Sequence, residues 1–233
     1  MKRLLFLILT LCLLTAFVAC DSDTPQISQN NDTTNTTTAT PVVDLATSYT
    51  TSLPVADGVT NFVQFTMVGG ATFVVELYPE IAPETVDNFQ RLVYAGFYDG
   101  LTFHRIYKDF MIQGGDPKGD GTGSSRMQIK GEFSANGYTG NTLAHERGVI
   151  SMARKTDPDS ASCQFFIMHQ DTPSLNGNYA AFGRVVAGME TVDTIAALEV
   201  TEQKISNEKT KPVRVPVIES AYFVNYTPAV PTT

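Results

Sequence analysis

The segment 103–116 carries the residue types most able to do chemistry in this chain, and it reads FHRIYKDFMIQGGD. It brings one arginine, Arg105, and one amide, Gln113, close in sequence to the large apolar side chains of Phe110 and Met111. None of these four residues is a nucleophile. Such a set can hold and polarise an amide but has no group to cleave it, which indicates chemistry in which no covalent bond is made or broken.

Short apolar segments separated by glycines must position these residues. The alternation of residues 62–68 and 71–77 around Gly69-Gly70 predicts a β-hairpin. Further short apolar segments, each of strand length, lie at residues 101–106, 110–113, 148–153, 164–168, 181–186 and 213–223.

Two helices are predicted beside these strands. Pro83 suits a first helical turn, and apolar residues at helical spacing follow it up to a stop at Gly96. A second, shorter helix should follow Gly188, with Met189, Val192 and Ile195 on one face. Many short strands with two peripheral helices favour a mainly β fold, a closed or nearly closed antiparallel β-barrel.

Five ordered motifs resemble the cyclophilin-type peptidyl-prolyl cis–trans isomerases. They are FHRI at 103–106, FMIQGGD at 110–116, GVISMA at 148–153, QFFI at 164–167 and AFGRV at 181–185. The resemblance spans residues 61–225. It implies a closed eight-stranded antiparallel β-barrel capped by two α-helices, and rotation about X–Pro peptide bonds without a cofactor.

The resemblance also assigns roles at the site. Arg105 is expected to donate a hydrogen bond to the proline nitrogen, which turns pyramidal in the twisted state, so that the contact is strongest there. Gln113 is expected to hold either Arg105 or the substrate carbonyl. The residues expected to bind the proline ring and the extended peptide around it are Phe110, Met111, Ala153, Arg154, Gln164, Phe166, Leu175 and Tyr179.

Three positions depart from the best-known eukaryotic members of this family. Arg154 stands where Asn is frequent, Ser174 replaces a tryptophan, and Tyr179 replaces a histidine. Tyr179 can still donate a hydrogen bond and wall the pocket. Because the missing tryptophan contributes to binding of cyclosporin-type drugs, weak inhibition by them is expected.

The N-terminus predicts export. Lys2 and Arg3 precede an apolar run from Leu4 to Val18, which is short for a membrane span but suits a signal peptide over residues 1–19. The small residue before Cys20 resembles a bacterial lipobox, although Phe17 stands where Leu is usual. We therefore expect an extracytoplasmic lipoprotein anchored through Cys20, with plain secretion and a retained membrane anchor as alternatives.

Composition divides the rest of the chain. Residues 20–52 are rich in Thr, Asn and Ser and predict a disordered tether, followed by an isomerase domain at 53–227 and a flexible tail at 228–233.

Loss of the signal would change the formal net charge from −8 to −10, which argues against nucleic-acid binding. The expected partners are proline-containing unfolded or extended polypeptides and, through the lipid, a membrane. We expect a monomer.

Other chemistry is disfavoured by spacing. The three histidines have no metal-ligand spacing, and residues 114–123 match neither a phosphate loop nor a calcium loop, so no metal or cofactor is expected. Cys163 should be a packed side chain.

Two rival functions stay open. One is a binding module that holds proline-containing segments and for which catalytic turnover is incidental. The other is a surface adhesin or substrate-binding lipoprotein.

Overall fold

The computed structural model describes residues 60–202 and 208–227. The predicted signal peptide, Cys20, the tether and the C-terminal tail lie outside the described residues. The eight strands of the large sheet are β1 (Phe62–Met67), β2 (Thr72–Leu77), β3 (Thr102–Tyr107), β4 (Met111–Asp116), β5 (Val149–Met152), β6 (Phe165–Met168), β7 (Ala181–Ala187) and β10 (Ile218–Phe223).

This sheet is antiparallel and runs in the order β10-β1-β2-β7-β5-β6-β4-β3. Its two edges come together through one isolated bridge between Thr102 and Val217 and through neighbouring backbone hydrogen bonds, such as Phe103 N–H to the Pro216 carbonyl at 3.1 Å. The sheet therefore curls back on itself without a continuous ladder between β3 and β10. The predicted mainly β fold with two helices is confirmed.

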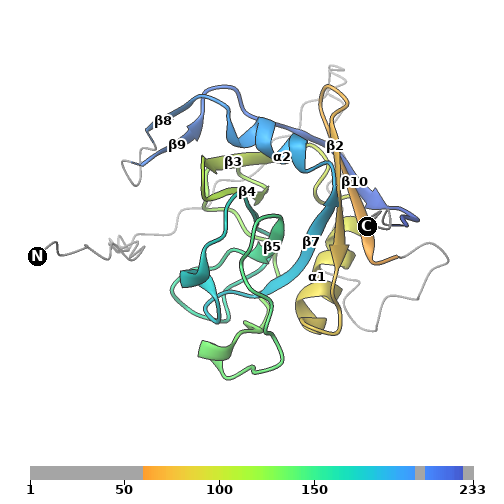
Figure 1. The fold of residues 1–233 in the computed structure, drawn as a ribbon, viewed down its shortest axis with the longest axis vertical. Coiled ribbons are helices and arrows are strands. Elements are labelled where there is room, and N and C mark those ends of the chain that lie inside the picture. Colours follow the sequence, from red (N-terminus) through yellow and green to blue (C-terminus); the bar gives the residue numbers. More distant parts are fainter. Residues whose placement is uncertain (1–59, 203–207, 228–233) are drawn as a thin grey trace, which may run out of the picture. The chain divides into compact units, whose positions relative to one another are not determined.

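Two helices contribute to the main core. Helix α1 (Pro83–Tyr94) begins at the predicted proline, and α2 (Met189–Ala196) follows Gly188, as predicted. Helix α1 lies beside β10 and α2 beside β2 (Figure 1). Apolar side chains of both helices join the main core with the aromatic residues Phe65, Phe73, Phe89, Phe103, Phe165 and Phe182.

Several boundaries differ from the sequence-based expectation. The last strand begins at Ile218 and not at residue 213, because Pro216 has no N–H to give to a ladder. Strand β4 continues through Gly114 and Gly115 to Asp116. Two short 3₁₀ helices, η2 (Ser134–Asn136) and η3 (Pro173–Leu175), lie in the connecting loops.

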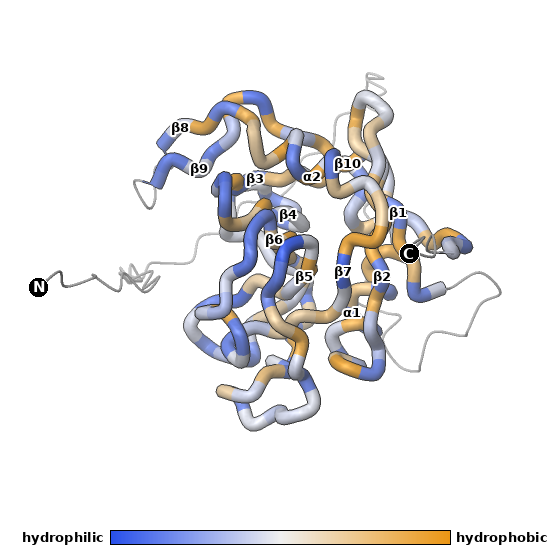
Figure 2. The backbone as a smooth tube through the Cα atoms, in the orientation of Figure 1, coloured by the Kyte–Doolittle hydropathy of each residue, from blue (hydrophilic) through white to orange (hydrophobic). Residues whose placement is uncertain are grey.

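A second, small sheet was not predicted. Strands β8 (Val200–Glu202) and β9 (Lys209–Pro212) pair antiparallel, and β9 lies against β3. This β8–β9 hairpin projects beside β3 in Figure 1 and is mostly hydrophilic in Figure 2, whereas β2 and β7 are strongly apolar. Its polar sequence has no strand-like alternation, so the pattern of apolar residues could not reveal it.

Candidate functional site

A single row of paired residues crosses four strands of the large sheet. Arg105 on β3 lies opposite Gln113 on β4, Gln113 lies opposite Phe166 on β6, and Phe166 lies opposite Ser151 on β5. Directly opposed residues of neighbouring strands point to the same face of a sheet. The guanidinium, the amide and the aromatic ring are therefore on one face, although they are up to 61 residues apart in sequence.

Strand alternation makes that face apolar next to Arg105. On β4 and β6 the residues that alternate with the row, such as Ile112 and Ile167, belong to the main core. The apolar residues on the same face of the sheet as Gln113 and Phe166 form a separate set, here called the outer cluster. Its buried members are Met111, Val149, Phe166, Met168 and Ala181, and Phe110, Leu143, Ala153, Leu175 and Tyr179 pack against them.

The outer cluster contains six of the residues expected to bind the peptide. Met111 and Phe166 are buried in it, and the other four are partly exposed at its border. These four are Phe110, Ala153, Leu175 and Tyr179. A partly exposed apolar patch beside an arginine can receive a proline ring, which has no polar group of its own to satisfy.

A string of hydrogen bonds orients the polar side of the site. Arg105 Nη1 donates to Gln113 Oε1 at 3.4 Å, and Gln113 Nε2 donates to Gln164 Oε1 at 2.9 Å. Gln164 Nε2 in turn donates to the carbonyl oxygen of Gly123 at 2.7 Å. The structure thus brings all three predicted polar residues together and fixes which way each amide points.

Arg154 lies next to the outer cluster, on the ring of Tyr179, and is not a member of the cluster. Its guanidinium carbon is 4.7 Å from the centre of the Tyr179 ring, and its Nη2 donates to the Asn178 carbonyl at 2.9 Å. Tyr179 meets Phe166 edge-on, with ring centres 5.7 Å apart. Arg154 therefore braces the aromatic wall of the pocket and adds a positive charge at its rim.

The backbone at Ala153 is partly committed to the fold. Its N–H donates to the Gln164 carbonyl at 2.9 Å, which extends the pairing of β5 with β6 by one residue. The N–H of Ala153 is therefore already in use within the fold.

His145 is a site residue that sequence reasoning missed. Its ring stacks on Phe166 with centres 6.0 Å apart, and its Nε2 lies 3.0 Å from Ser151 Oγ. Burial lowers the pKa of His145, so the ring is held neutral. The ring of His145 packs against one face of the Phe166 ring. His145 lies in a loop before β5 and is held there by Asn176, whose Oδ1 accepts from the His145 backbone N–H at 2.7 Å. No local pattern in the sequence indicates this position.

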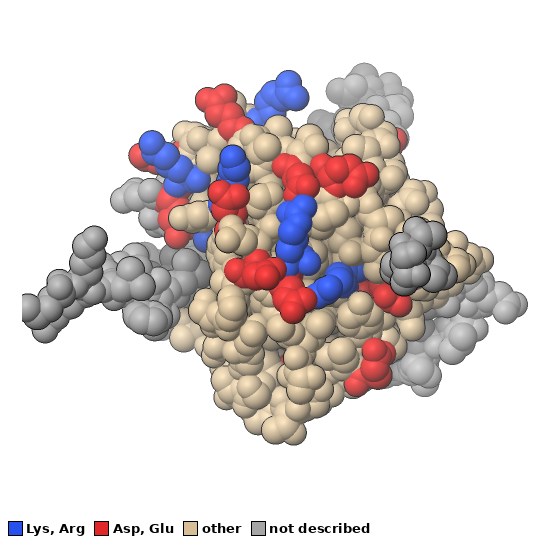
Figure 3. Space-filling model, viewed as in Figure 1, with Lys and Arg blue, Asp and Glu red and all other residues tan. Residues whose placement is uncertain are grey.

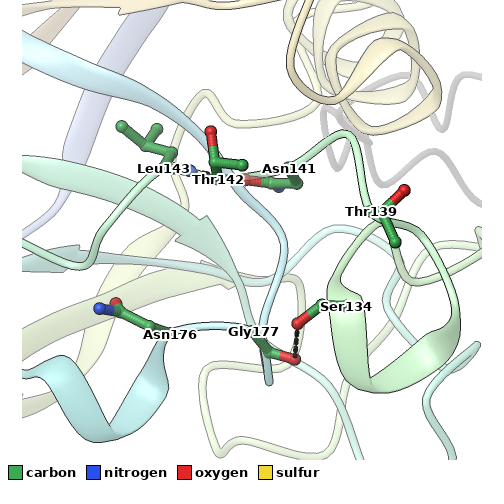
Figure 4. Close-up of a pocket in the computed structure, with 7 residues that line it drawn as sticks. All are labelled: Ser134, Thr139, Asn141, Thr142, Leu143, Asn176 and Gly177. Carbon is green, nitrogen blue, oxygen red and sulfur yellow. Dashed lines mark hydrogen bonds between the residues drawn. The ribbon is translucent and has the colours of Figure 1, made fainter.

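A cavity of about 350 Å³ lies in the loops next to the outer cluster (Figure 4). Leu143, one of its lining residues, also packs against the outer cluster. The lining carries hydroxyl and amide groups but no charge, and it comprises Ser134, Thr139, Asn141, Thr142, Leu143, Asn176 and Gly177. None of the predicted site residues lines this cavity.

Other candidate chemistry finds no support in the part of the chain that the structure describes. In residues 60–202 and 208–227, no group of three or more His, Cys, Asp or Glu side chains could hold a metal ion. Cys163 is fully buried, and this burial raises the pKa of its thiol. Within the same ranges, no helix is long and apolar enough to cross a membrane.

Comparisons with known proteins agree with the geometry. Residues 62–221 match the family model of cyclophilin type peptidyl-prolyl cis-trans isomerases. Peptidyl-prolyl cis-trans isomerase B of Bacillus subtilis is 47% identical over 126 residues, which cover 54% of this chain and 84% of that protein. Peptidyl-prolyl cis-trans isomerase-like 1 of Gibberella zeae is 38% identical over 160 residues, covering 69% of this chain and 96% of that protein.

The fold gives the same result. A crystal structure of a cyclophilin type peptidyl-prolyl cis-trans isomerase from Cryptosporidium parvum matches with a TM-score of 0.62 and 30% identity, covering 72% of this chain and 99% of that one. The chain belongs to the cyclophilin-type peptidyl-prolyl cis–trans isomerases. It is an isomerase of X–Pro peptide bonds.

Proposed function

We propose that Arg105 is the catalytic residue of this isomerase and that the outer cluster holds the proline ring while the preceding carbonyl rotates. The barrier to rotation about a peptide bond is about 18–20 kcal/mol because amide resonance must be broken. In the twisted state the proline nitrogen gains a lone pair. A guanidinium that donates to this nitrogen stabilises the twisted state more than the planar one, which is the requirement for catalysis.

One observation supports this assignment above all others. Arg105, Gln113 and Phe166 are successive partners across β3, β4 and β6, so a cation lies on the same face as an apolar ring-binding patch. Gln113 is proposed to hold the guanidinium, and Gln164 to hold Gln113. A related cyclophilin from Cryptosporidium parvum has been crystallised in the presence of the dipeptide Ala-Pro, which supports a proline-containing peptide as substrate here.

Substitution of Arg105 tests the catalytic assignment. Arg105→Ala in the full chain should lower kcat/KM for a short X–Pro peptide by about 10²–10³-fold, the usual cost of one donor that acts in the transition state. NMR exchange spectroscopy measures the rate directly. Arg91→Ala is the matched control, because this arginine pairs with Asp87 within α1 and lies outside the site.

The result separates catalysis from mere binding. Loss of exchange with the peptide still bound supports the role of Arg105. Undiminished exchange in Arg105→Ala would mean that the apolar patch alone suffices, and the assignment would fail.

We further propose that the enzyme acts outside the cytoplasm on exported proteins. Lys2, Arg3 and the following apolar run support export, and Cys20 supports a lipid anchor. Exported chains arrive unfolded, and uncatalysed proline isomerisation takes tens to hundreds of seconds. A tethered isomerase of acidic net charge would meet extended polypeptides there as a monomer, without nucleic acid or cofactor.

Metabolic labelling tests the anchor. The full chain expressed in a bacterium should incorporate radiolabelled palmitate and sediment with membranes, whereas Cys20→Ala should lose both properties. Cys12→Ala serves as the control, because Cys12 lies within the predicted signal. A wild-type chain that stays unlabelled and soluble outside the cell would support plain secretion instead.

A further inference from the structure

The proposed catalytic arginine has a second charged partner that the sequence motifs do not contain. Arg105 Nη2 donates to Glu208 Oε2 at 3.0 Å. The two residues are 103 positions apart in sequence. Their side chains are 18% and 34% exposed, so the ion pair is partly shielded from water. Shielding strengthens such a pair compared with one on the open surface.

Glu208 is carried by an anchored element. It immediately precedes β9, which lies against β3, the strand of Arg105. Thr210 is fully buried between the exposed residues Lys209 and Lys211, so one side of β9 packs against the protein. The carboxylate therefore has a defined position relative to the guanidinium. Charged side chains are dense over this part of the molecule in Figure 3.

The guanidinium of Arg105 is therefore held by hydrogen bonds to two side chains. Gln113 accepts from Nη1, and Glu208 accepts from Nη2. A guanidinium has five N–H donors in a rigid planar fork, so these two contacts define its plane and leave further donors for the substrate. Without the carboxylate, one long bond of 3.4 Å to Gln113 would have to orient a side chain with four rotatable bonds.

We infer that Glu208 is a positioning residue for the isomerisation, acting through Arg105. This inference rests on the proposed catalytic role of Arg105. The donor must be held where it can reach the proline nitrogen of the twisted amide. A small error in the position of the donor sharply lowers the rate. The carboxylate also draws part of the positive charge away from the substrate. The ion pair thus weakens the electrostatic attraction between Arg105 and the substrate, but it fixes the orientation of the guanidinium.

Substitutions of Glu208 in the full chain test this role. Glu208→Ala should lower kcat about tenfold while KM changes less than about twofold, because orientation in the transition state is lost but the ring pocket is intact. Glu208→Gln, which keeps an acceptor, should recover part of the loss. Glu202→Gln is the matched control, because Glu202 is an exposed carboxylate on β8 that lies opposite Lys209 in the same hairpin.

A spectroscopic measurement guards against a purely structural effect. In ¹⁵N NMR spectra, the Nη groups of Arg105 should rotate slowly in the wild type and faster in Glu208→Ala, with the amide spectrum of the core unchanged. The double variant Arg105→Ala/Glu208→Ala should be no slower than Arg105→Ala alone, because Glu208 acts only through the arginine.

The outcomes distinguish the two proposals. If Arg105→Ala keeps the wild-type rate, the proposed role of Arg105 fails, and the inference about Glu208 fails with it. If Arg105→Ala is inactive while Glu208→Ala matches or exceeds the wild-type kcat, the catalytic role stands and Glu208 is not a positioning residue. A gain of activity would mean instead that the carboxylate competes with the substrate for the guanidinium.

Discussion

At the scale of single residues, the pocket wall depends on side chains that support one another. Tyr179 lies between the guanidinium of Arg154 and the ring of Phe166, and His145 lies beneath that ring. The motif residues therefore act in a frame supplied by residues outside the motifs.

Tyr179 provides a prediction at this scale. Tyr179→Ala should lower kcat/KM about tenfold, because it removes the edge-on contact with Phe166 and opens the pocket. Tyr179→Phe should stay within about twofold of the wild type, since the ring is kept. Peptide isomerisation measured by NMR exchange checks both variants. A strong loss in Tyr179→Phe would show that the hydroxyl itself contacts the substrate.

Inhibitor binding provides a second prediction. Ser174 lies exposed in η3, next to Leu175 at the border of the outer cluster, and replaces the tryptophan expected from better-known relatives. We expect cyclosporin-type compounds to inhibit weakly, and Ser174→Trp to improve inhibition. A titration of isomerase activity is decisive, and submicromolar inhibition of the wild type would contradict this expectation.

At the scale of elements, helix α1 is capped by a residue far away in sequence. Ala82 precedes the helix and has no side-chain cap, but the carboxylate of Glu132 accepts from the N–H groups of Glu84 at 3.0 Å and Thr85 at 2.8 Å. Glu132 is 3% exposed. Its charge also complements the positive end of the helix dipole.

Loss of this cap should destabilise the fold without touching the site. Glu132→Gln should lower the free energy of unfolding by about 1–3 kcal/mol, because charged hydrogen bonds to buried N–H groups are weakened. Urea unfolding measures the change, and Glu80→Gln is the control because Glu80 is exposed in the preceding turn. Equal stability of both variants would mean that the negative charge of Glu132 does not contribute to the cap.

Strands β5 and β6 also show what an element requires of its sequence. Every residue of both strands is buried, because one face meets the main core and the other belongs to the outer cluster or lies next to it. A continuous apolar run results on β6, and β5 is interrupted only by the buried Ser151. The position of both strands was predictable from these runs. The runs themselves do not say which of Phe165 and Phe166 faces the outer cluster, and only the family motif at 164–167 singled out Phe166.

At the scale of the whole molecule, buried histidines link stability to pH. Burial lowers the pKa of both His104 and His145 from the ordinary value of 6.5. The unfolded chain then binds protons at a higher pH than the folded chain does. Stability from this source is complete above about pH 6.5 and is lost as the pH falls below it.

Denaturation at pH 7.5 and 5.5 should reveal this linkage. The free energy of unfolding should fall toward pH 5.5, with each histidine contributing at most about 1.4 kcal/mol per pH unit. His104→Leu should reduce the dependence of the free energy of unfolding on pH. His104 is 6% exposed in the folded chain, and a leucine at this position cannot bind a proton on unfolding. An unchanged slope in this variant would show that His104 does not contribute.

The sequence by itself determined the class of fold and the family, and it predicted most of the residues of the candidate site. Glycine positions, apolar runs and the five motifs are local features, and local features are sufficient to place strands, α1, Arg105, Gln113 and Phe166. The tertiary structure alone decided the β8–β9 hairpin and the contacts of Glu208, His145 and Glu132. These contacts join loop residues to elements far away in the sequence, and their polar side chains leave no periodic pattern in the chain.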